Sequence, residues 1–343
     1  MQHKITKPSK LLDKNGELIQ KGYALSPILT YRRKNVARKL RLKEWDYYLV
    51  YNKDYAVALT IGKSAAIVLI SITFIDFVKE KEITKSVIRM VKKKQLEMPE
   101  SPEVGDIIYK DKDVNLSFVH RNSTRELYLY LKNFEKASDI KVFIRLFNEP
   151  KDSMVIATPF KEDKKAFFYN QKTIGMSACG HIRIKDQTYP FSPNDSFGLL
   201  DWGRGVWPYK TTWYWSAGQD MIGGDLFGFN LGYGFGDTSQ ATENLLFLNG
   251  IASKLTDVVF NIPKNDKNEY DYMKPWTITS SDQRFEMVFV PTMDINVNLN
   301  AIVLSTNQHQ VYGKFTGNAI LDDGSIVYVS DFLGFAERVE KKW

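Results

Sequence analysis

Residues 46–77 read DYYLVYNKDYAVALTIGKSAAIVLISITFIDF. Apolar and aromatic side chains fill three runs, at 46–51, 55–61 and 65–77, and the polar triplets Asn-Lys-Asp and Gly-Lys-Ser separate them. Runs rich in Val, Ile, Tyr and Phe favour β-strands, and short polar or glycine-containing segments between them favour turns. The stretch therefore predicts three consecutive antiparallel strands joined as a meander.

The same pattern recurs later in the chain. Residues 311–321 and 326–335 flank the triplet 322–324, Asp-Asp-Gly, which is a strong hairpin signal. Apolar side chains occupy every second position at Ile140, Val142, Ile144 and Leu146. Because strands do not alternate with long amphipathic helices, the pattern argues against a doubly wound α/β fold and for an all-β class.

A chain of 343 residues is longer than one small closed barrel needs. We therefore expect two lipocalin-like antiparallel β-barrels, or barrel-like sandwiches, in tandem, with few short helices. The polar segment 148–153 is the best internal boundary, which predicts an N-terminal unit at 1–152 and a C-terminal unit at 153–343. The oligomeric state does not follow from the sequence.

The chain carries a formal net charge of +7, and much of the excess lies between Lys4 and Lys43. A basic surface can bind nucleic acid or anionic lipid. No helix-turn-helix pattern, zinc-finger spacing or aromatic RNA-binding signature accompanies the charge, so we expect no nucleic-acid partner. Peripheral contact of the basic N-terminal stretch with a membrane stays open.

The cysteine and histidine positions and the hydropathy pattern bear on the cellular location of the protein and on whether it holds a metal or cofactor. Cys179 is the only cysteine, so an internal disulfide is impossible. The N-terminus lacks the apolar core of a secretory signal, and the longest apolar run, 65–70, is too short to cross a bilayer. We expect a cytoplasmic protein. The histidines are scattered without paired spacing, so we expect no metal site and no cofactor.

Residues 201–215 read DWGRGVWPYKTTWYW and hold four of the seven tryptophans. One interpretation is a core plug: Gly-Val-Trp at 205–207 is typical of the first strand of lipocalin-type barrels, where the Trp closes one end and Arg338 could cover it. The other is a cavity: Trp213 and Trp215 lie two apart on a strand and share a face. Asp201 and Arg204 would then lie at its edge.

The role of Asp201 depends on its neighbours. Burial among indoles would raise the pKa of this carboxyl group and allow it to donate a proton. Pairing with Arg204 would lower the pKa and make both residues structural, and the sequence leaves both alternatives open. The segment 228–236 alternates glycine with aromatic residues, which indicates a strand with rings on one face and bare backbone on the other. The candidate ligand-binding residues are Trp202, Trp207, Tyr209, Trp213, Trp215, Asn230, Glu243 and His181.

These motifs carry a resemblance. Residues 168–180, 201–205 and 213–215 look like a bacterial family known as domain of unknown function 2804, with a match from about Gly22 to Arg338. More distantly the chain is similar to the AttH-like and carotenoid 1,2-hydratase group of the calycins. That resemblance implies tandem lipocalin-like barrels that hold long apolar or isoprenoid ligands, and some members hydrate a double bond or promote a cycloaddition. It places Asp201 on the motif Asp of the group, and Trp213 and Trp215 on its paired tryptophans.

Three functions remain open. The first is binding, with or without proton-transfer chemistry of a hydratase, isomerase or cyclase type, of a lipid or isoprenoid-like molecule in an aromatic pocket. Asp201 would protonate a double bond, the indoles would face the developing cation, and Arg204 would hold a polar end or position Asp201. The second is a non-catalytic ligand-binding or scaffold protein with a tryptophan-rich core. The third is a carbohydrate-active or carbohydrate-binding protein, for which Asp201 and Glu243 are the carboxylate pair.

Overall fold

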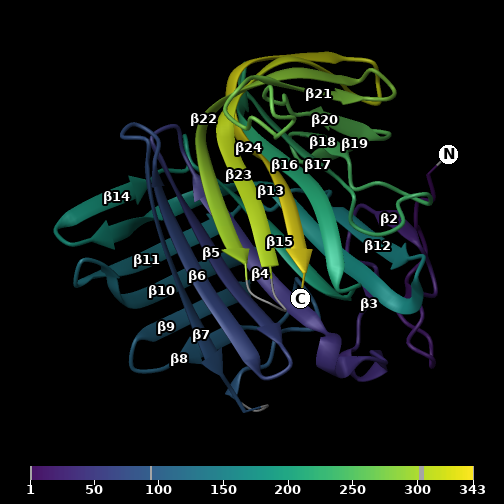
Figure 1. Cartoon of the computed structure of the whole chain (residues 1–343), viewed down its shortest axis with the longest axis horizontal. Coiled ribbons are helices and arrows are strands. Elements are labelled where there is room, and N and C mark those ends of the chain that lie inside the picture. Colours follow the sequence, from purple (N-terminus) through teal and green to yellow (C-terminus); the bar gives the residue numbers. More distant parts are fainter. Residues whose placement is uncertain (1, 93–94, 301–304, 343) are drawn as a thin grey trace.

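The computed structural model describes residues 2–92, 95–300 and 305–342, and nearly all of the regular structure in them is β-strand (Figure 1). Two curled antiparallel sheets make up the molecule, as expected for tandem lipocalin-like barrels. The all-β prediction is therefore confirmed. The described helical structure is confined to 3-10 turns, among them η1 (Arg33–Asn35) and η2 (Lys39–Arg41). No helix in this part of the chain is long and apolar enough to span a membrane.

The first sheet has ten strands along its main path. In spatial order these are β7 (Lys81–Met90), β6 (Ile67–Asp76), β5 (Tyr55–Ser64), β4 (Lys43–Tyr51), β15 (Phe197–Val206), β13 (Asp163–Ile184), β11 (Ser138–Phe147), β10 (Thr124–Glu135), β9 (Val114–Arg121) and β8 (Ile107–Lys110). Beside this path, β12 (Met154–Phe160) and β14 (Gln187–Phe191) pair with β13, and β2 (Gly22–Ala24) pairs with β12. A separate parallel pair joins β1 (Ser9–Lys10) to β3 (Leu29–Thr30).

The second sheet has nine strands. In spatial order these are β19 (Ile251–Lys254), β18 (Leu245–Leu248), β17 (Asp225–Tyr233), β16 (Lys210–Ile222), β24 (Ile326–Lys342), β23 (Ser305–Ile320), β22 (Phe285–Asn300), β21 (Trp276–Ser280) and β20 (Val258–Asn261). The predicted hairpin at 322–324 joins β23 to β24, and the predicted meander is β4, β5 and β6.

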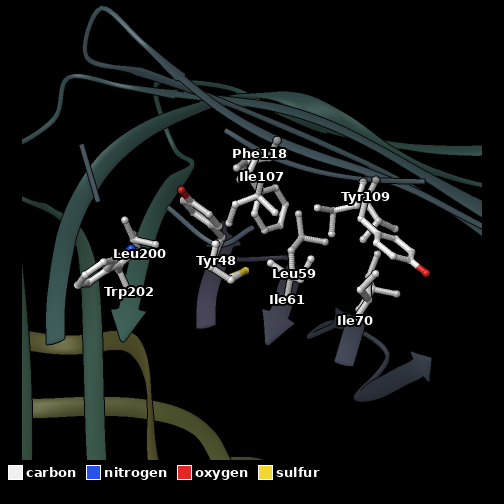
Figure 2. Close-up of a cluster of buried hydrophobic side chains, with 14 of the residues drawn as sticks. Tyr48, Leu59, Ile61, Ile70, Ile107, Tyr109, Phe118, Leu200 and Trp202 are labelled. Carbon is white, nitrogen blue, oxygen red and sulfur yellow. The ribbon is translucent and has the colours of Figure 1, made fainter. Parts of the chain in front are cut away.

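Three clusters of buried apolar side chains hold the sheets together. One lies within the first sheet and includes Tyr48, Leu59 and Trp202 (Figure 2). Another, with Phe229, belongs to the second sheet. The third draws side chains from both sheets, among them Phe168 and Trp215 from the facing strands β13 and β16, and we call it the inter-sheet core. Burial of this shared apolar area fixes the two sheets against each other.

The sheets divide the chain after β15. Strands β12 to β15, residues 154–206, belong to the first sheet, where β13 pairs with β11 and β15 pairs with β4, and β16 begins the second sheet. Sheet membership thus changes between Val206 and Lys210, later in the chain than the segment 148–153. The division into units 1–152 and 153–343 remains a prediction. The motif residues 201–205 and 213–215 consequently lie on different sheets.

Candidate functional site

Strand β15 separates the motif residues onto two faces, because successive side chains on a strand point in opposite directions. Leu200 and Trp202 lie in the core of the first sheet, whereas Leu199 lies in the inter-sheet core. Asp201 and Gly203 therefore belong to the face toward the second sheet, and Arg204 shares the face of Trp202.

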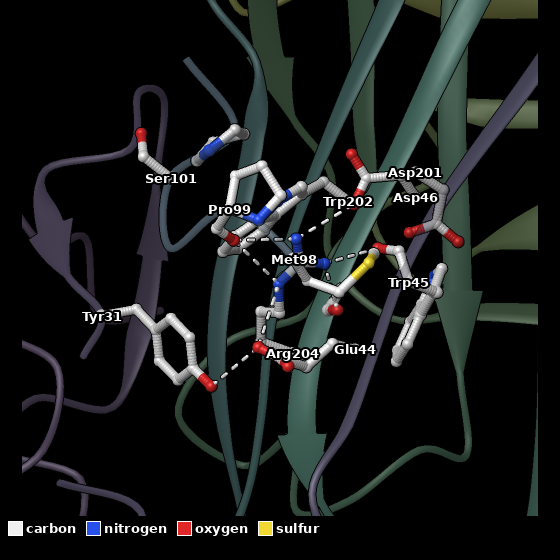
Figure 3. A network of polar contacts seen from close by, with 12 residues as sticks. Tyr31, Glu44, Trp45, Asp46, Met98, Pro99, Ser101, Asp201, Trp202 and Arg204 are labelled. Atoms are coloured by element: carbon white, nitrogen blue, oxygen red, sulfur yellow. Dashed lines mark hydrogen bonds and ion pairs between the residues drawn. The ribbon is translucent and has the colours of Figure 1, made fainter. Parts of the chain in front are cut away.

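Arg204 is completely buried in the first sheet. Figure 3 shows the polar contacts around it. Its guanidinium group donates a hydrogen bond to Asp46 Oδ1 at 3.0 Å and another to the carbonyl oxygen of Trp45 at 2.6 Å. It also lies over the Trp202 ring, 4.1 Å from the centroid. The structure does not bring Arg204 or Trp202 to the face of Asp201, and Asp46 rather than Asp201 neutralises the arginine.

Asp201 is buried, with 9% of its surface exposed. Asn170 Nδ2 on β13 donates a hydrogen bond to Asp201 Oδ1 at 2.5 Å. Burial raises the pKa of the carboxyl group above its usual range, and the Lys172 ammonium and hydrogen bonds from Asn170 and Trp45 only partly oppose this effect. Of the two alternatives drawn from the sequence, the structure shows the buried acid with a raised pKa.

Lys172 joins this carboxyl group to the second sheet. It stands opposite Asp201 in the register of β13 and β15. Its Nζ donates to Asn170 Oδ1 at 2.9 Å and to Glu243 Oε2 at 2.6 Å, and it lies 5.0 Å from the centroid of the Trp215 ring. Glu243 belongs to the segment between β17 and β18, so this ion pair crosses from one sheet to the other.

Two further predicted residues complete this contact. Asn230 Oδ1 accepts a hydrogen bond from Trp215 Nε1 at 2.8 Å, and Asn230 Nδ2 donates to the Glu243 carbonyl oxygen at 2.8 Å. A side chain at Gly232 would collide with the Glu243 carboxylate. The structure thus brings Asp201, Trp215, Asn230 and Glu243 together. The bare backbone predicted for this segment is the feature that lets the carboxylate approach β17.

Glu337 on β24 is a site residue that the sequence reasoning missed. It is 5% exposed, and Trp213 Nε1 donates a hydrogen bond to its Oε1 at 3.0 Å. Burial, helped by the charge of Asp201 and opposed by the Trp213 hydrogen bond and the charges of Lys341 and Lys172, raises the pKa of Glu337 to about 7. A signal existed, because Glu337 stands between Phe335 and Val339 at alternating positions of a strand, where an apolar residue is expected.

An aromatic wall flanks the two acids. It consists of Trp45, Trp207, Trp213 and Phe235. Ring centroids are 5.6 Å apart for Trp45 and Trp207, 5.2 Å for Trp207 and Phe235, and 5.4 Å for Trp213 and Phe235. Trp207 is buried, whereas Trp45, Trp213 and Phe235 are only half-buried, so part of the wall is open to solvent. Such rings present apolar and π surface to a small molecule.

One expectation is wrong, the one for Arg338, whereas the ligand-binding roles expected for Tyr209 and His181 stay predictions. Arg338 does not cover Trp207, because it lies 4.5 Å from the Tyr270 ring centroid, and Lys43 covers Trp207 instead. Tyr209 is half exposed in the turn that leads into β16. His181 is exposed on β13 opposite Phe143, on the part of that strand that pairs with β11. The positions of these residues depend on contacts between distant parts of the chain, because proximity to the tryptophans in sequence does not determine which strands a residue packs against.

The model of the family described as domain of unknown function (DUF2804) matches residues 2–343. The chain belongs to this family. Comparison with curated proteins finds no match. A solved structure of a putative AttH from Nitrosomonas europaea superposes on this DUF2804 member with a TM-score of 0.56 at 12% identity, covering 87% of this chain and 92% of the other. That likeness shows the fold alone.

Two other solved structures are more distant from the DUF2804 chain. Kievitone hydratase from Nectria haematococca has a TM-score of 0.45 and 9% identity, and covers 98% of each chain. CghA with Sch210972 has a TM-score of 0.43 and 8% identity, and covers 88% of each chain. The resemblance inferred from the sequence is confirmed at the level of family and fold.

Within the described residues of this DUF2804 member, no group of three His, Cys, Asp or Glu side chains could hold a metal ion.

Proposed function

We propose that this protein binds an apolar lipid or isoprenoid-like molecule between its two sheets and transforms it by proton transfer. The observation that carries the proposal is the pair Asp201 and Glu337. These are two buried carboxyl groups with raised pKa values, one on each sheet, beside an aromatic wall. A raised pKa suits a buried carboxyl group to general acid and base catalysis.

The arrangement supports a simple reaction. The Asp201 carboxyl group donates its proton to one carbon of a double bond, and positive charge develops on the neighbouring carbon beside the indole rings, whose faces favour a cation. The Glu337 carboxylate then takes a proton from the next carbon, and the net change is migration of the double bond. If water adds to the cation instead, the product is an alcohol and the excess proton returns to Asp201.

Arg204 has no part in this proposal, because it lies on the other face of β15. A carbohydrate-active site built on Asp201 and Glu243 is less well supported, since Lys172 Nζ already binds Glu243 at 2.6 Å. The second candidate is a non-catalytic binding protein. The Lys172–Glu243 ion pair favours it, because a contact between the sheets can be structural without any chemistry.

The experiment uses farnesol as the probe in deuterium oxide. Farnesol binding should quench the tryptophan fluorescence of the wild-type protein. The wild-type protein should also introduce deuterium at vinylic or allylic carbons of farnesol, detected by mass spectrometry. Asp201→Asn should retain the fold and farnesol binding but lose deuterium incorporation by at least about 100-fold, as expected for removal of a general acid. Asp323→Asn, on the exposed β23–β24 turn, is the matched control and should behave as wild type.

The outcomes separate the candidates. Binding without deuterium incorporation by the wild type contradicts the enzyme and leaves the non-catalytic binder. Absence of binding, together with native mass spectra that show no apolar molecule copurified without detergent, contradicts both. A large fall in the melting temperature of Asp201→Asn would show that the residue is structural.

A further inference from the structure

Strand ends from both sheets gather at one edge of the molecule (Figure 1). On the first sheet, the start of β4 pairs with the end of β15, where Lys43 stands opposite Gly205. On the second sheet, the start of β16 pairs with the end of β24, where Lys210 stands opposite Lys342. Because only the short connection 207–209 leads from β15 into β16, these strand ends lie close to one another.

Two further segments are attached to this edge. The turn η2 is held there by Arg41, whose Nη2 donates a hydrogen bond to the Trp207 carbonyl oxygen at 2.6 Å. The β12–β13 turn is held beside η2 by an ion pair of 2.6 Å between Arg38 and Asp163. We define the basic edge by its four segments, residues 38–43, 161–165, 207–210 and 340–342.

The positive charge of the protein is concentrated on the basic edge. Its segments hold ten Lys or Arg and three Asp or Glu, an excess of seven that equals the formal net charge of the whole chain. Two of the three acids are already paired, Asp163 with Arg38 and Glu340 with Arg338. Three lysines are exposed and form no ion pair within the part of the chain that the structure describes, namely Lys39, Lys164 and Lys165. Such a surface attracts anionic partners.

Apolar side chains project from this cationic surface. Leu40, in the middle of η2 between Lys39 and Arg41, is 84% exposed. Tyr209, in the turn before β16, is 51% exposed. A single exposed leucine is ordinary on a protein surface. An exposed leucine and tyrosine among lysines and arginines, however, match the two layers of a membrane interface, because the apolar groups enter the acyl boundary while the cations face phosphate groups.

The basic edge also borders the aromatic wall. Trp207 belongs to both, and Trp213 lies three residues after Lys210 on β16. Trp213 and Phe235 are only half-buried, so the wall is partly open beside this edge. A bilayer in contact with the basic edge would therefore lie next to the apolar surface that the proposed function assigns to the ligand.

We propose that the basic edge docks on the surface of a bilayer that contains anionic phospholipid. Leu40 and Tyr209 enter the headgroup region, and the exposed lysines of the edge bind lipid phosphate groups. The inference goes beyond the proposed function, because docking requires neither Asp201 nor any proton transfer. It gives the apolar ligand a source, since a molecule dissolved in the bilayer reaches the aromatic wall without crossing water.

The test is flotation of the full chain with vesicles of phosphatidylcholine, either alone or with about 30 mol% phosphatidylglycerol. The wild-type protein should bind the anionic vesicles at least about tenfold more tightly, and sodium chloride at about 0.5 M should abolish this preference. Lys39→Gln and Lys164→Gln should each weaken binding to the anionic vesicles about fivefold, as expected for one cation near such a surface. Leu40→Gln, which changes no charge, should weaken it about tenfold.

Two substitutions far from the basic edge are the controls. Lys136→Gln removes an exposed lysine from the β10–β11 turn, which lies at the opposite end of β13 from Asp163. Ile326→Gln removes an apolar side chain that is 48% exposed at the first residue of β24, the opposite end of that strand from Lys342. Both variants should bind vesicles as the wild type does. Because every substitution alters an exposed side chain, all variants should keep the melting temperature of the wild type.

A second measurement locates the leucine relative to the bilayer. An environment-sensitive dye attached to Leu40→Cys, in a Cys179→Ser background, should brighten and shift its emission to shorter wavelength when anionic vesicles are added. The same dye attached to Lys136→Cys should show no change, because that turn faces away from the basic edge.

The results can contradict the docking surface in three ways. Equal binding to neutral and anionic vesicles overturns it, and so does binding by Leu40→Gln that is as tight as that of the wild type. A DNA duplex that binds more tightly than the anionic vesicles, with no effect of Leu40→Gln, overturns it in favour of a nucleic-acid surface.

These results are distinguishable from failure of the proposed function. Farnesol binding and deuterium incorporation are measured without vesicles, so they stand or fall independently of docking. Leu40→Gln should retain both at the wild-type level. Vesicle binding by a protein that neither binds nor transforms farnesol would overturn the proposed function and leave the docking surface in place.

Discussion

At the scale of single residues, Asp201 and Arg204 show how far residue type alone can be interpreted. Both are charged, three positions apart and buried, yet strand alternation sends them to opposite faces of β15. Arg204 forms an ion pair with Asp46 of β4. Asp201 instead accepts a hydrogen bond from Asn170 of β13 and lies near the charge of Lys172 on the same strand. The sequence singled out both residues, but it could not supply partners that lie on other strands, and the role of Asp201 as an acid stays a prediction.

Glu337 yields a prediction about pH. Its pKa is raised from 4.5 to about 7 in the folded state. Between these values the folded protein holds the proton and the unfolded chain does not, so stability falls as pH rises from about 4.5 to about 7 and is flat above. Glu337→Gln removes this dependence. Relative to wild type, the variant should gain about 3 kcal/mol in free energy of unfolding between pH 4.5 and pH 8, measured by urea denaturation.

Glu286→Gln, which alters an exposed glutamate of β22, provides the comparison and should show no such gain. If the free energy of unfolding of the wild type changed with pH in parallel with that of Glu337→Gln across this range, Glu337 would be ionised in the folded protein. It would then be unable to alternate between acid and base near neutral pH.

At the scale of elements, the strands were predictable because their signals are local. The meander of β4 to β6 and the turn at 322–324 appear as expected. Strand ends were less accurate: Gly62, Lys63 and Ser64 continue β5, and the chain turns at Ala65, which has a positive φ of 50°. The ladder between β4 and β5 extends the strand there, because β4 starts early enough to pair with Ser64. Such pairing is not visible in the turn residues themselves.

Glycine in β17 leads to a prediction about the contact between elements. A Cβ on Gly228 would lie 2.7 Å from Ile174 Cγ2 of β13, closer than packed atoms tolerate. Gly228→Ala should therefore lower the free energy of unfolding by about 1–3 kcal/mol, the usual cost of overpacking. Gly62→Ala, whose Cβ would meet nothing nearer than 3.8 Å, should instead be neutral or stabilising by roughly 0.5–1 kcal/mol. Urea denaturation of both variants checks the pair, and equal effects would show that β13 and β17 are not in close contact.

At the scale of the whole molecule, the candidate site exists only because the two sheets meet. Asp201 and Lys172 come from the first sheet, and Glu243 and Glu337 from the second. The order of strands around a sheet depends on contacts between residues far apart in sequence, such as β4 with β15. Local patterns do not encode such pairings one by one. The aromatic cluster and Asp201 were therefore predictable as a location, whereas Glu337 and Lys172, which come from other strands, were not.

The ion pair of Lys172 and Glu243 allows this assembly to be tested. Lys172 is 4% exposed, so its loss leaves the Glu243 carboxylate in apolar surroundings without its cation. Lys172→Met should lower the free energy of unfolding by about 3–5 kcal/mol, and the double variant with Glu243→Gln should recover much of that loss, because no uncompensated charge remains. A double-mutant cycle by urea denaturation measures the coupling. Additive effects of the two substitutions would show that the residues do not interact across the sheets. Strong coupling would mean that the surface facing the ligand and the surface joining the two sheets share the same side chains.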